Sequence, residues 1–328
     1  MTTNARREEP MRKEWWEKYL TVNARQLTAF AEILAREDLG VPDWRGPVFP
    51  SEDNGQFIEF LGVGNAINFC ATDPVTGEKF ATEWRGKRWV GTFGIWAALR
   101  RAIEARRNIL EPATLQAFTA ADVARIFEPA PGSPSLPLIR ERAMQLQNVG
   151  TVLAQRFNGS FAWLFDYCGW DVPRIVETLT IFFPAYGCDR WLHPATKESI
   201  SFDNRARLLP LMYEGRARAS EGRLRTLRRV EQLGPVADYD APKALRHLGV
   251  LVYTRAVANA VDSGTMLPSG SEEELAIRWA TCVAMSTLLR LVNGRREQPI
   301  SMIELDFAIL SRGRVKAPRH HVTLTTAY

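Results

Sequence analysis

The sequence is poor in cysteine and histidine, with four of each among its 328 residues. The cysteines form none of the close pairs that zinc sites or small disulfide frameworks use: Cys70, Cys168, Cys188 and Cys282. The histidines stand alone apart from one adjacent pair, His320–His321, which has no third metal ligand nearby in the sequence. These absences predict buried free thiols and no structural metal.

Long apolar runs are also missing, since no stretch approaches the roughly 18 to 20 uninterrupted apolar residues of a membrane helix. The first residues lack the apolar centre of a signal peptide. We therefore expect a cytoplasmic protein that does not bind membranes. Because 46% of its residues are hydrophobic and 10% aromatic, the chain has enough apolar material for a large folded core.

Charge of one sign is only slightly in excess, with a formal net charge of +5. Such an excess is mild for a dedicated nucleic-acid binder and fits a small substrate that carries a phosphate. The densest basic run lies between Arg216 and Arg229, interleaved with Glu214, Glu221 and Glu231. We interpret it as a salt-bridged helix face, with a nucleic-acid surface as the alternative.

The spacing of apolar residues predicts the fold class. They recur at three- and four-residue intervals from 12 to 38, which predicts helices. From about 57 to 90 the period changes to two, for example in Phe57–Phe60 and Phe80–Trp84, which predicts a small antiparallel meander. After Gly91 the helical period returns and mostly persists. We expect a mostly α protein with a small antiparallel β element.

The domain organisation is read from the same pattern. Pro129–Pro137 is the most linker-like stretch and could be a domain boundary or a surface loop. We expect a single compact unit over residues 1–328, with a helical N-terminal part at 1–50, the meander at about 57–90 and a helical core at about 92–328.

The segment at 233–251 carries the best candidate for chemistry. Asp240 is a good N-cap, Pro242 suits a first helical turn and Gly249 can end the helix. Asp238 thus lies just before a short helix, where backbone N–H groups keep a carboxylate ionised. Such a group can stabilise, or attack, the cationic ribose that forms as an N-glycosidic bond breaks. By itself, the local pattern favours two aspartates that only cap the helix.

A resemblance strengthens the catalytic interpretation. The stretch from Val236 to Gly249 resembles the end of the helix-hairpin-helix motif of base-excision DNA glycosylases, where the catalytic aspartate precedes a helix that ends in Leu-Gly. Asp238 is the matching position, and the resemblance implies a glycosylase-like helical core. The lysine of the bifunctional glycosylases has no clear counterpart, so strand-cleaving lyase chemistry is not implied.

A second resemblance covers nearly the whole chain, which is similar to the queuosine salvage proteins, the queuosine 5′-phosphate N-glycosylase/hydrolase family. Eleven segments in the family's order carry it: Asn65–Phe69, Arg85–Lys87, Arg140–Arg142, Phe157–Phe161, Phe183–Tyr186, Ser201–Phe202 with Arg205–Ala206, Ala237–Tyr239, His247–Gly249, Met266–Leu267, Glu274 with Ile277–Arg278, and Leu305–Asp306.

This resemblance implies hydrolysis of queuosine 5′-monophosphate to queuine and ribose 5-phosphate without a redox or metal cofactor. It implies that Asp238 is the catalytic aspartate, a nucleophile or transition-state stabiliser. The positions that it implies for base binding are Gly234, Val236, Asp306, Phe307 and Ser311.

Chemistry supports one of these positions and leaves others open. Queuine, a 7-deazaguanine, presents two adjacent N–H donors that one carboxylate, Asp306, can accept. Family members carry Tyr in place of Phe307 and a second carboxylate in place of Ser311, so recognition of the base's tail can differ here. For the 5′-phosphate the candidates are Arg205, Lys197 and His247. Phe49 is a candidate for stacking on the base.

Two other functions are weighed against this hypothesis. A helix-hairpin-helix DNA-repair glycosylase would need a broad basic face and would flip bases out of the duplex. A non-catalytic nucleotide- or tRNA-binding protein would use the basic run and would not depend on Asp238. The preferred interpretation expects a small-molecule substrate and no stable nucleic-acid complex.

Overall fold

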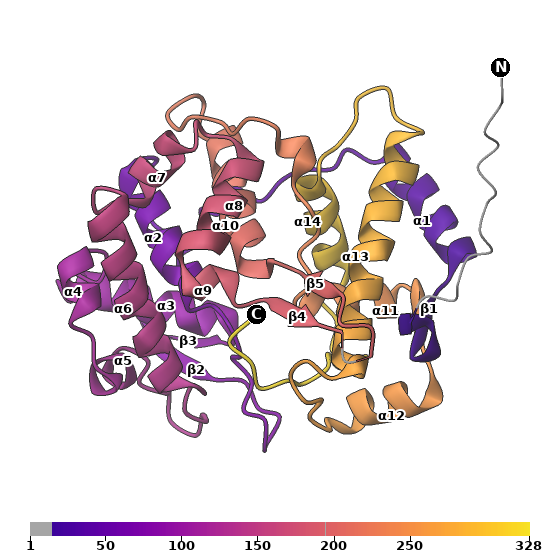
Figure 1. Cartoon of the computed structure of the whole chain (residues 1–328), viewed down its shortest axis with the longest axis horizontal. Coiled ribbons are helices and arrows are strands. Elements are labelled where there is room, and N and C mark those ends of the chain that lie inside the picture. Colours follow the sequence, from indigo (N-terminus) through magenta and orange to yellow (C-terminus); the bar gives the residue numbers. More distant parts are fainter. Residues whose placement is uncertain (1–14, 194) are drawn as a thin grey trace.

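The computed structural model describes residues 15–193 and 195–328 and contains two groups of helices side by side (Figure 1). The first group follows the chain from residue 55 to 218: α2 (Gly55–Ala66), α3 (Thr92–Glu104), α4 (Pro112–Gln116), α5 (Ala120–Ile126), α6 (Ile139–Arg156), α7 (Phe161–Tyr167), α8 (Val172–Phe182), α9 (Pro184–Gly187) and α10 (Asn204–Arg218).

The second group combines one early helix with the last four: α1 (Ala24–Arg36), α11 (Asp240–His247), α12 (Arg255–Ser263), α13 (Glu272–Asn293) and α14 (Met302–Arg312). Helix α13 is central, because α1, α11 and α14 all pack against it. Among the described residues, α13 is the one helix long and apolar enough to span a membrane by composition. Its contacts and its buried Arg278 are those of a core helix.

The strands form three separate antiparallel pairs. Pairing joins β1 (Leu20–Val22) to β6 (Leu251–Tyr253), β2 (Ala81–Trp84) to β3 (Lys87–Val90), and β4 (Arg190–Leu192) to β5 (Ser199–Ser201). Two short 3-10 helices complete the described elements, η1 (Trp15–Lys18) and η2 (Val230–Gln232). The predicted mostly α class with small antiparallel β elements is confirmed.

The meander predicted at 57–90 is wrong in its first half. Residues 55–66 form α2, and the antiparallel pairing is confined to the β2–β3 hairpin and a bridge between Thr72 and Lys79. Nearly every residue of α2 from Phe57 onward is buried, so the helix has no solvent face to give it a helical period. The exception is Glu59, whose carboxylate accepts hydrogen bonds at the start of α7.

The N-terminal prediction is correct only for α1. Residues 1–14 lie outside the described part, and β1 occupies part of the stretch expected to be helical because it pairs with β6 from the far end of the chain. The segment from 37 to 54 forms no helix. The proline-rich stretch at 129–137 is a loop that runs between α5 and α6.

The basic run is largely paired with acidic residues. Helix α10 ends at Arg218, and the residues from 219 to 229 form a loop rather than a helix face. Arg216 is buried against Asp53, and Arg229 pairs with Asp171. Ion pairs also hold Arg218, Arg223 and Arg225. The run therefore contributes to folding more than to a free basic surface.

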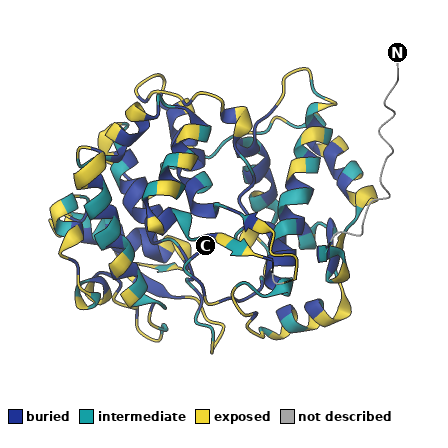
Figure 2. Cartoon of the chain, in the orientation of Figure 1, coloured by how far each residue is buried: buried dark blue, intermediate teal, exposed yellow. Residues whose placement is uncertain are grey.

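One continuous hydrophobic core extends across both groups of helices, from Trp16 to Ile309 (Figure 2). Its tightest contact lies where α2 meets α3: a Cβ at Gly64 would fall 1.9 Å from the Trp96 ring. No other residue has a side chain small enough for this contact. Glycine here is required by close packing rather than by backbone conformation.

We expect Gly64→Ala to lower the free energy of unfolding by about 1 to 3 kcal/mol, because the added methyl group must displace Trp96 or α2. Denaturant unfolding followed by tryptophan fluorescence measures the loss. Gly55→Ala is the matched control, since it lies in the first turn of the same helix with nothing within 4 Å of the added atom. Equal stability of the two variants would contradict the packing argument.

Candidate active site

A pocket opens between the two groups of helices, around the end of the chain's described C-terminal segment. Residues from five stretches of the sequence line it: Asn68, Phe69, Cys70, Ala71, Thr72, Lys79, Gly91, Thr92, Asn204, Leu208, Asp238, Tyr239, Asp240, His320 and Tyr328. In Figure 1 the C-terminal segment runs between the groups close to β4 and β5. Asp238, the predicted catalytic residue, thus lies on the wall of a pocket.

Asp238 both caps a helix and faces this pocket. Its Oδ1 accepts hydrogen bonds from the backbone N–H groups of Asp240 at 2.8 Å and Ala241 at 3.3 Å. Its Oδ2 has no hydrogen-bond partner among the described residues. The helix begins at Asp240 itself, so Asp238, not Asp240, supplies the capping side chain. Gly249, with φ of 70°, ends the helical segment as predicted.

The surroundings of Asp238 oppose its ionisation. Burial and the negative charge of Asp240 raise the pKa of Asp238 to about 6. The two backbone N–H groups and Arg278 act in the opposite direction. At neutral pH the carboxylate is therefore ionised in a site shielded from water, where its charge acts strongly on a nearby cation.

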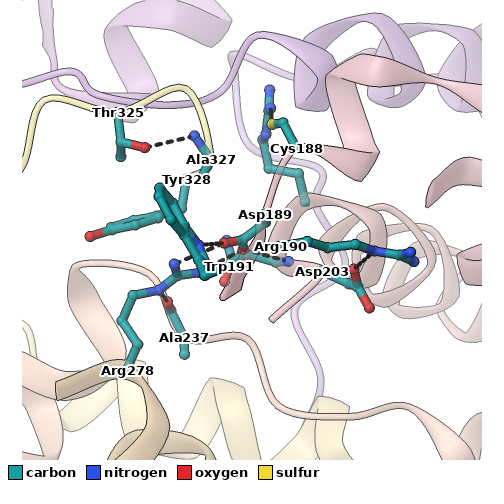
Figure 3. Close-up of polar contacts among 12 residues, drawn as sticks. Cys188, Asp189, Arg190, Trp191, Asp203, Ala237, Arg278, Thr325, Ala327 and Tyr328 are labelled. Carbon is teal, nitrogen blue, oxygen red and sulfur yellow. Dashed lines mark hydrogen bonds and ion pairs between the residues drawn. The ribbon is translucent and has the colours of Figure 1, made fainter. Parts of the chain in front are cut away.

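A buried ion pair holds the backbone of this loop (Figure 3). The Arg278 guanidinium on α13 donates to both oxygens of Asp189, at 2.8 and 2.6 Å, and its Nε donates to the carbonyl of Ala237 at 2.8 Å. Neither side chain is exposed by more than 1%. Asp189 also accepts from the backbone N–H of Asn204, so one pair anchors two walls of the pocket.

Further groups surround the same guanidinium. Arg278 lies 4.0 Å from the centre of the Tyr328 ring, and the Tyr328 hydroxyl donates to Glu274 at 2.8 Å. His321 contacts that hydroxyl through Nε2 at 3.0 Å. Although burial alone lowers it, the carboxylates of Asp189 and Glu274 hold the pKa of Arg278 above its ordinary value. Arg278 therefore remains protonated and positively charged.

Asp306 is the second predicted carboxylate, and the structure places it near the first. It lies on α14 with 5% of its surface exposed and makes no hydrogen bond with a described residue. Burial raises the pKa of Asp306 well above its ordinary value, and the charges of Asp238 and Asp240 raise it further. Asp306 is not among the residues that line the pocket around Asp238. A buried carboxylate without a partner is suited to a ligand that brings hydrogen-bond donors.

The other predicted base-binding positions lie close to these carboxylates in the sequence: Gly234 and Val236 precede Asp238, and Phe307 and Ser311 follow Asp306. Val236 is buried, and Gly234 lies against Arg207, whose Nη1 donates to the carbonyl of Pro235 at 3.0 Å. Phe307 is half-buried on α14, and Ser311 is exposed one turn later. None of these four residues lines the pocket that contains Asp238.

The three phosphate candidates do not line the pocket either. Arg205 is buried, and its guanidinium donates to the carbonyls of Ala66 and Thr326, which is a structural role. Lys197 is exposed in the turn between β4 and β5, and His247 is exposed at the end of α11.

Phe49, the stacking candidate, is 4% exposed and belongs to an aromatic cluster with Trp44, Phe60 and Trp96. Its neighbours are core residues.

Several polar residues of the pocket carried no role in the sequence interpretation, among them Lys79, Thr92, Asn204 and His320. One signal could have suggested part of this set. Gly91 stands between a strand and a helix, an arrangement that often exposes backbone N–H groups to an anion. Asn204 and His320 carried no comparable signal, because their neighbours in the pocket come from distant parts of the sequence.

Comparison with known proteins gives one consistent result. Residues 48–328 match the model of the family described as queuosine salvage protein. The chain is 29% identical over 285 residues to the queuosine 5′-phosphate N-glycosylase/hydrolase of Sphaerobacter thermophilus, covering 87% of this chain and 84% of that protein. The protein of that name from Bos taurus is 24% identical over 290 residues, covering 84% and 82%.

The similarity extends to fungi, where the Schizosaccharomyces pombe protein of the same name is 23% identical over 284 residues. The matched region includes every residue that lines the pocket around Asp238. The chain belongs to the queuosine salvage protein family.

Proposed function

We propose that this protein hydrolyses the N-glycosidic bond of queuosine 5′-phosphate and releases queuine and ribose 5-phosphate. The observation that carries the proposal is the carboxylate of Asp238, with one oxygen fixed by two backbone N–H groups and the other left for the pocket. The names of the similar proteins support the substrate. Fixing one oxygen orients the group before substrate binds.

In the proposed mechanism Asp238 acts on the ribose. As the bond between C1′ and the base nitrogen breaks, positive charge grows on the sugar, and the ionised carboxylate stabilises or traps it. A 7-deazapurine lacks the ring nitrogen that ordinary purine hydrolases protonate, so stabilisation of the cation carries more of the catalysis. A water then attacks C1′ and transfers a proton to a carboxylate of the pocket, Asp238 or Asp240, and this proton passes on to the base nitrogen, which left with the electron pair of the broken bond.

In the same proposal Asp306 identifies the base. The guanine-like edge of queuine offers the ring N1–H and the 2-amino group, which one carboxylate accepts together. Because burial favours the neutral acid of Asp306, these two donors would stabilise its ionised form, and base binding is linked to ionisation of Asp306. Phe307 and Ser311 follow on α14, where the tail of the base would extend.

A small-molecule substrate suits the charge distribution. Five of the six arginines from 216 to 229 are held in ion pairs, so the broad basic face that a DNA-repair glycosylase needs is weakly developed there. The proposal includes a cytoplasmic location and neither a stable nucleic-acid complex nor membrane binding.

The variant Asp238→Asn tests the central assignment. Asparagine caps a helix as well as aspartate does, so the fold is retained, but the negative charge is lost. We expect kcat for queuosine 5′-phosphate to fall by about 100- to 1,000-fold or more, measured by chromatography of released queuine. An unchanged melting temperature is the control, and undiminished release by the variant would remove Asp238 from the mechanism.

The pKa of Asp238 predicts the acid limb of the pH profile. Since the ionised form is required, kcat/KM should fall as the pH drops through about 6. Asp240→Asn removes a repulsive negative charge, so it lowers the pKa of Asp238 and moves the limb to lower pH. An acid limb that stays in place, or moves upward, in this variant would contradict the electrostatic assignment.

Asp306→Asn should weaken recognition of the base. It replaces two charge-assisted acceptor sites with a mixed donor and acceptor, so we expect the Kd for free queuine to rise by about 10- to 100-fold. Isothermal titration calorimetry measures this binding without catalysis. Ser311→Ala, on the same helix but exposed, is the comparison, and a larger loss in that variant than in Asp306→Asn would reverse the assignment.

A further inference from the structure

The pocket around Asp238 has a basic side that the mechanism above does not use. Lys79 lies on this side, and backbone pairing fixes its position. Lys79 forms an antiparallel β-bridge with Thr72. The backbone N–H of the next residue, Phe80, donates to the carbonyl of Ala71, and the Phe80 carbonyl accepts from the N–H of Gly91. The Lys79 ammonium makes no ion pair or hydrogen bond with any described residue. Its side chain passes over Gly91, where an added Cβ would lie 3.3 Å from the Lys79 Cδ.

Helix α3 begins at this point and leaves backbone donors exposed. Gly91, the N-cap, has φ of 62° and no side chain that could cap the helix. Within the described part of the chain, the N–H groups of Thr92 and Phe93 have no acceptor, and both residues are exposed. A lysine beside free amide donors at the start of a 13-residue helix favours an anion.

Asn204 gives an independent indication that a ligand belongs in this pocket. The residue is 1% exposed, and its Oδ1 is buried without a hydrogen-bond partner. Its backbone N–H is held by Asp189, so the side chain stays on the pocket wall. An unpaired buried amide is costly unless a ligand satisfies it, and a sugar hydroxyl can both donate and accept.

His320 offers a further unpaired polar atom in the same pocket. Its Nδ1 lies 2.6 Å from the carbonyl oxygen of His321 and therefore carries the proton in the neutral ring. Nε2 is left without a partner among the described residues, and His320 lines the pocket together with Lys79. Burial lowers the pKa of His320, so the neutral ring prevails at neutral pH and its Nε2 accepts a hydrogen bond, such as one from a sugar hydroxyl.

We propose that Lys79 and the first N–H groups of α3 bind the 5′-phosphate of the substrate, and that Asn204 and His320 bind hydroxyls of the ribose. This assignment rests on the proposed function for the identity of the ligand, a ribose 5-phosphate group. It replaces the candidates Arg205, Lys197 and His247, none of which lines the pocket. In this arrangement Asp238 and Asp240 face the sugar end, where positive charge develops, and Lys79 faces the phosphate end.

Lys79→Gln tests the phosphate contact, because glutamine keeps most of the length and removes the charge. We expect the Kd for ribose 5-phosphate, measured by isothermal titration calorimetry, and the KM for queuosine 5′-phosphate to rise by about 10- to 100-fold. The Kd for free queuine should not change, since the base binds elsewhere. Lys87→Gln, an exposed lysine on β3 in the neighbouring hairpin, is the matched control.

Asn204→Ala separates the sugar contact from the phosphate contact. It should weaken binding of ribose 5-phosphate and leave binding of inorganic phosphate unchanged, whereas Lys79→Gln should weaken both. Unchanged affinity of Lys79→Gln for ribose 5-phosphate, or an equal loss of queuine binding, would overturn the proposal. Failure of the wild-type protein to release queuine would refute the proposed function alone, because ribose 5-phosphate binding still decides the phosphate site.

Discussion

The pocket depends on the buried pair of Arg278 and Asp189. Each oxygen of the carboxylate accepts from a different nitrogen of the guanidinium, and the remaining nitrogen holds the carbonyl that precedes Asp238. Removing one partner of such a pair leaves an uncompensated charge in the core and typically costs about 3 to 5 kcal/mol. The same two side chains connect α13, the loop before α11 and the start of α10. Stability and the shape of the pocket are therefore inseparable here.

Asp238 combines two roles that would otherwise compete. A carboxylate that caps a helix usually has a low pKa, because backbone N–H groups favour its charge. In this pocket burial and the nearby Asp240 outweigh that effect and raise the pKa of Asp238 to about 6. The result is a group that is oriented by the helix, ionised at neutral pH and poorly compensated by water. These are the properties that stabilisation of a ribosyl cation needs.

The arrangement of charge along the pocket follows the expected charge of the ligand. Asp238 and Asp240 line the pocket from the loop before α11 and its start, and Lys79 and Thr92 line it from the β2–β3 region and the start of α3. Both helical groups therefore contribute residues to the pocket. The C-terminal segment completes the pocket. The Tyr328 hydroxyl donates a hydrogen bond to Glu274, and the backbone carbonyl of Tyr328 accepts one from the backbone N–H of Cys70.

Local sequence determined the mostly α class, the short helix after Asp238, and the β2–β3 hairpin, because turn residues and helix ends act over a few positions. Motif resemblance alone singled out Asp238 and Asp306 as candidates, and the structure places Asp238 on the wall of a pocket. The sequence pattern did not reveal that α2 is a helix, because a helix buried on nearly all sides shows no periodic alternation of apolar and polar residues. Arg205 carried charge suitable for a phosphate, and only its burial against backbone carbonyls revealed a structural role. The meeting of Lys79, Asn204 and His320 around one pocket was decided by tertiary packing, because residues so distant in sequence are brought together only when the core forms.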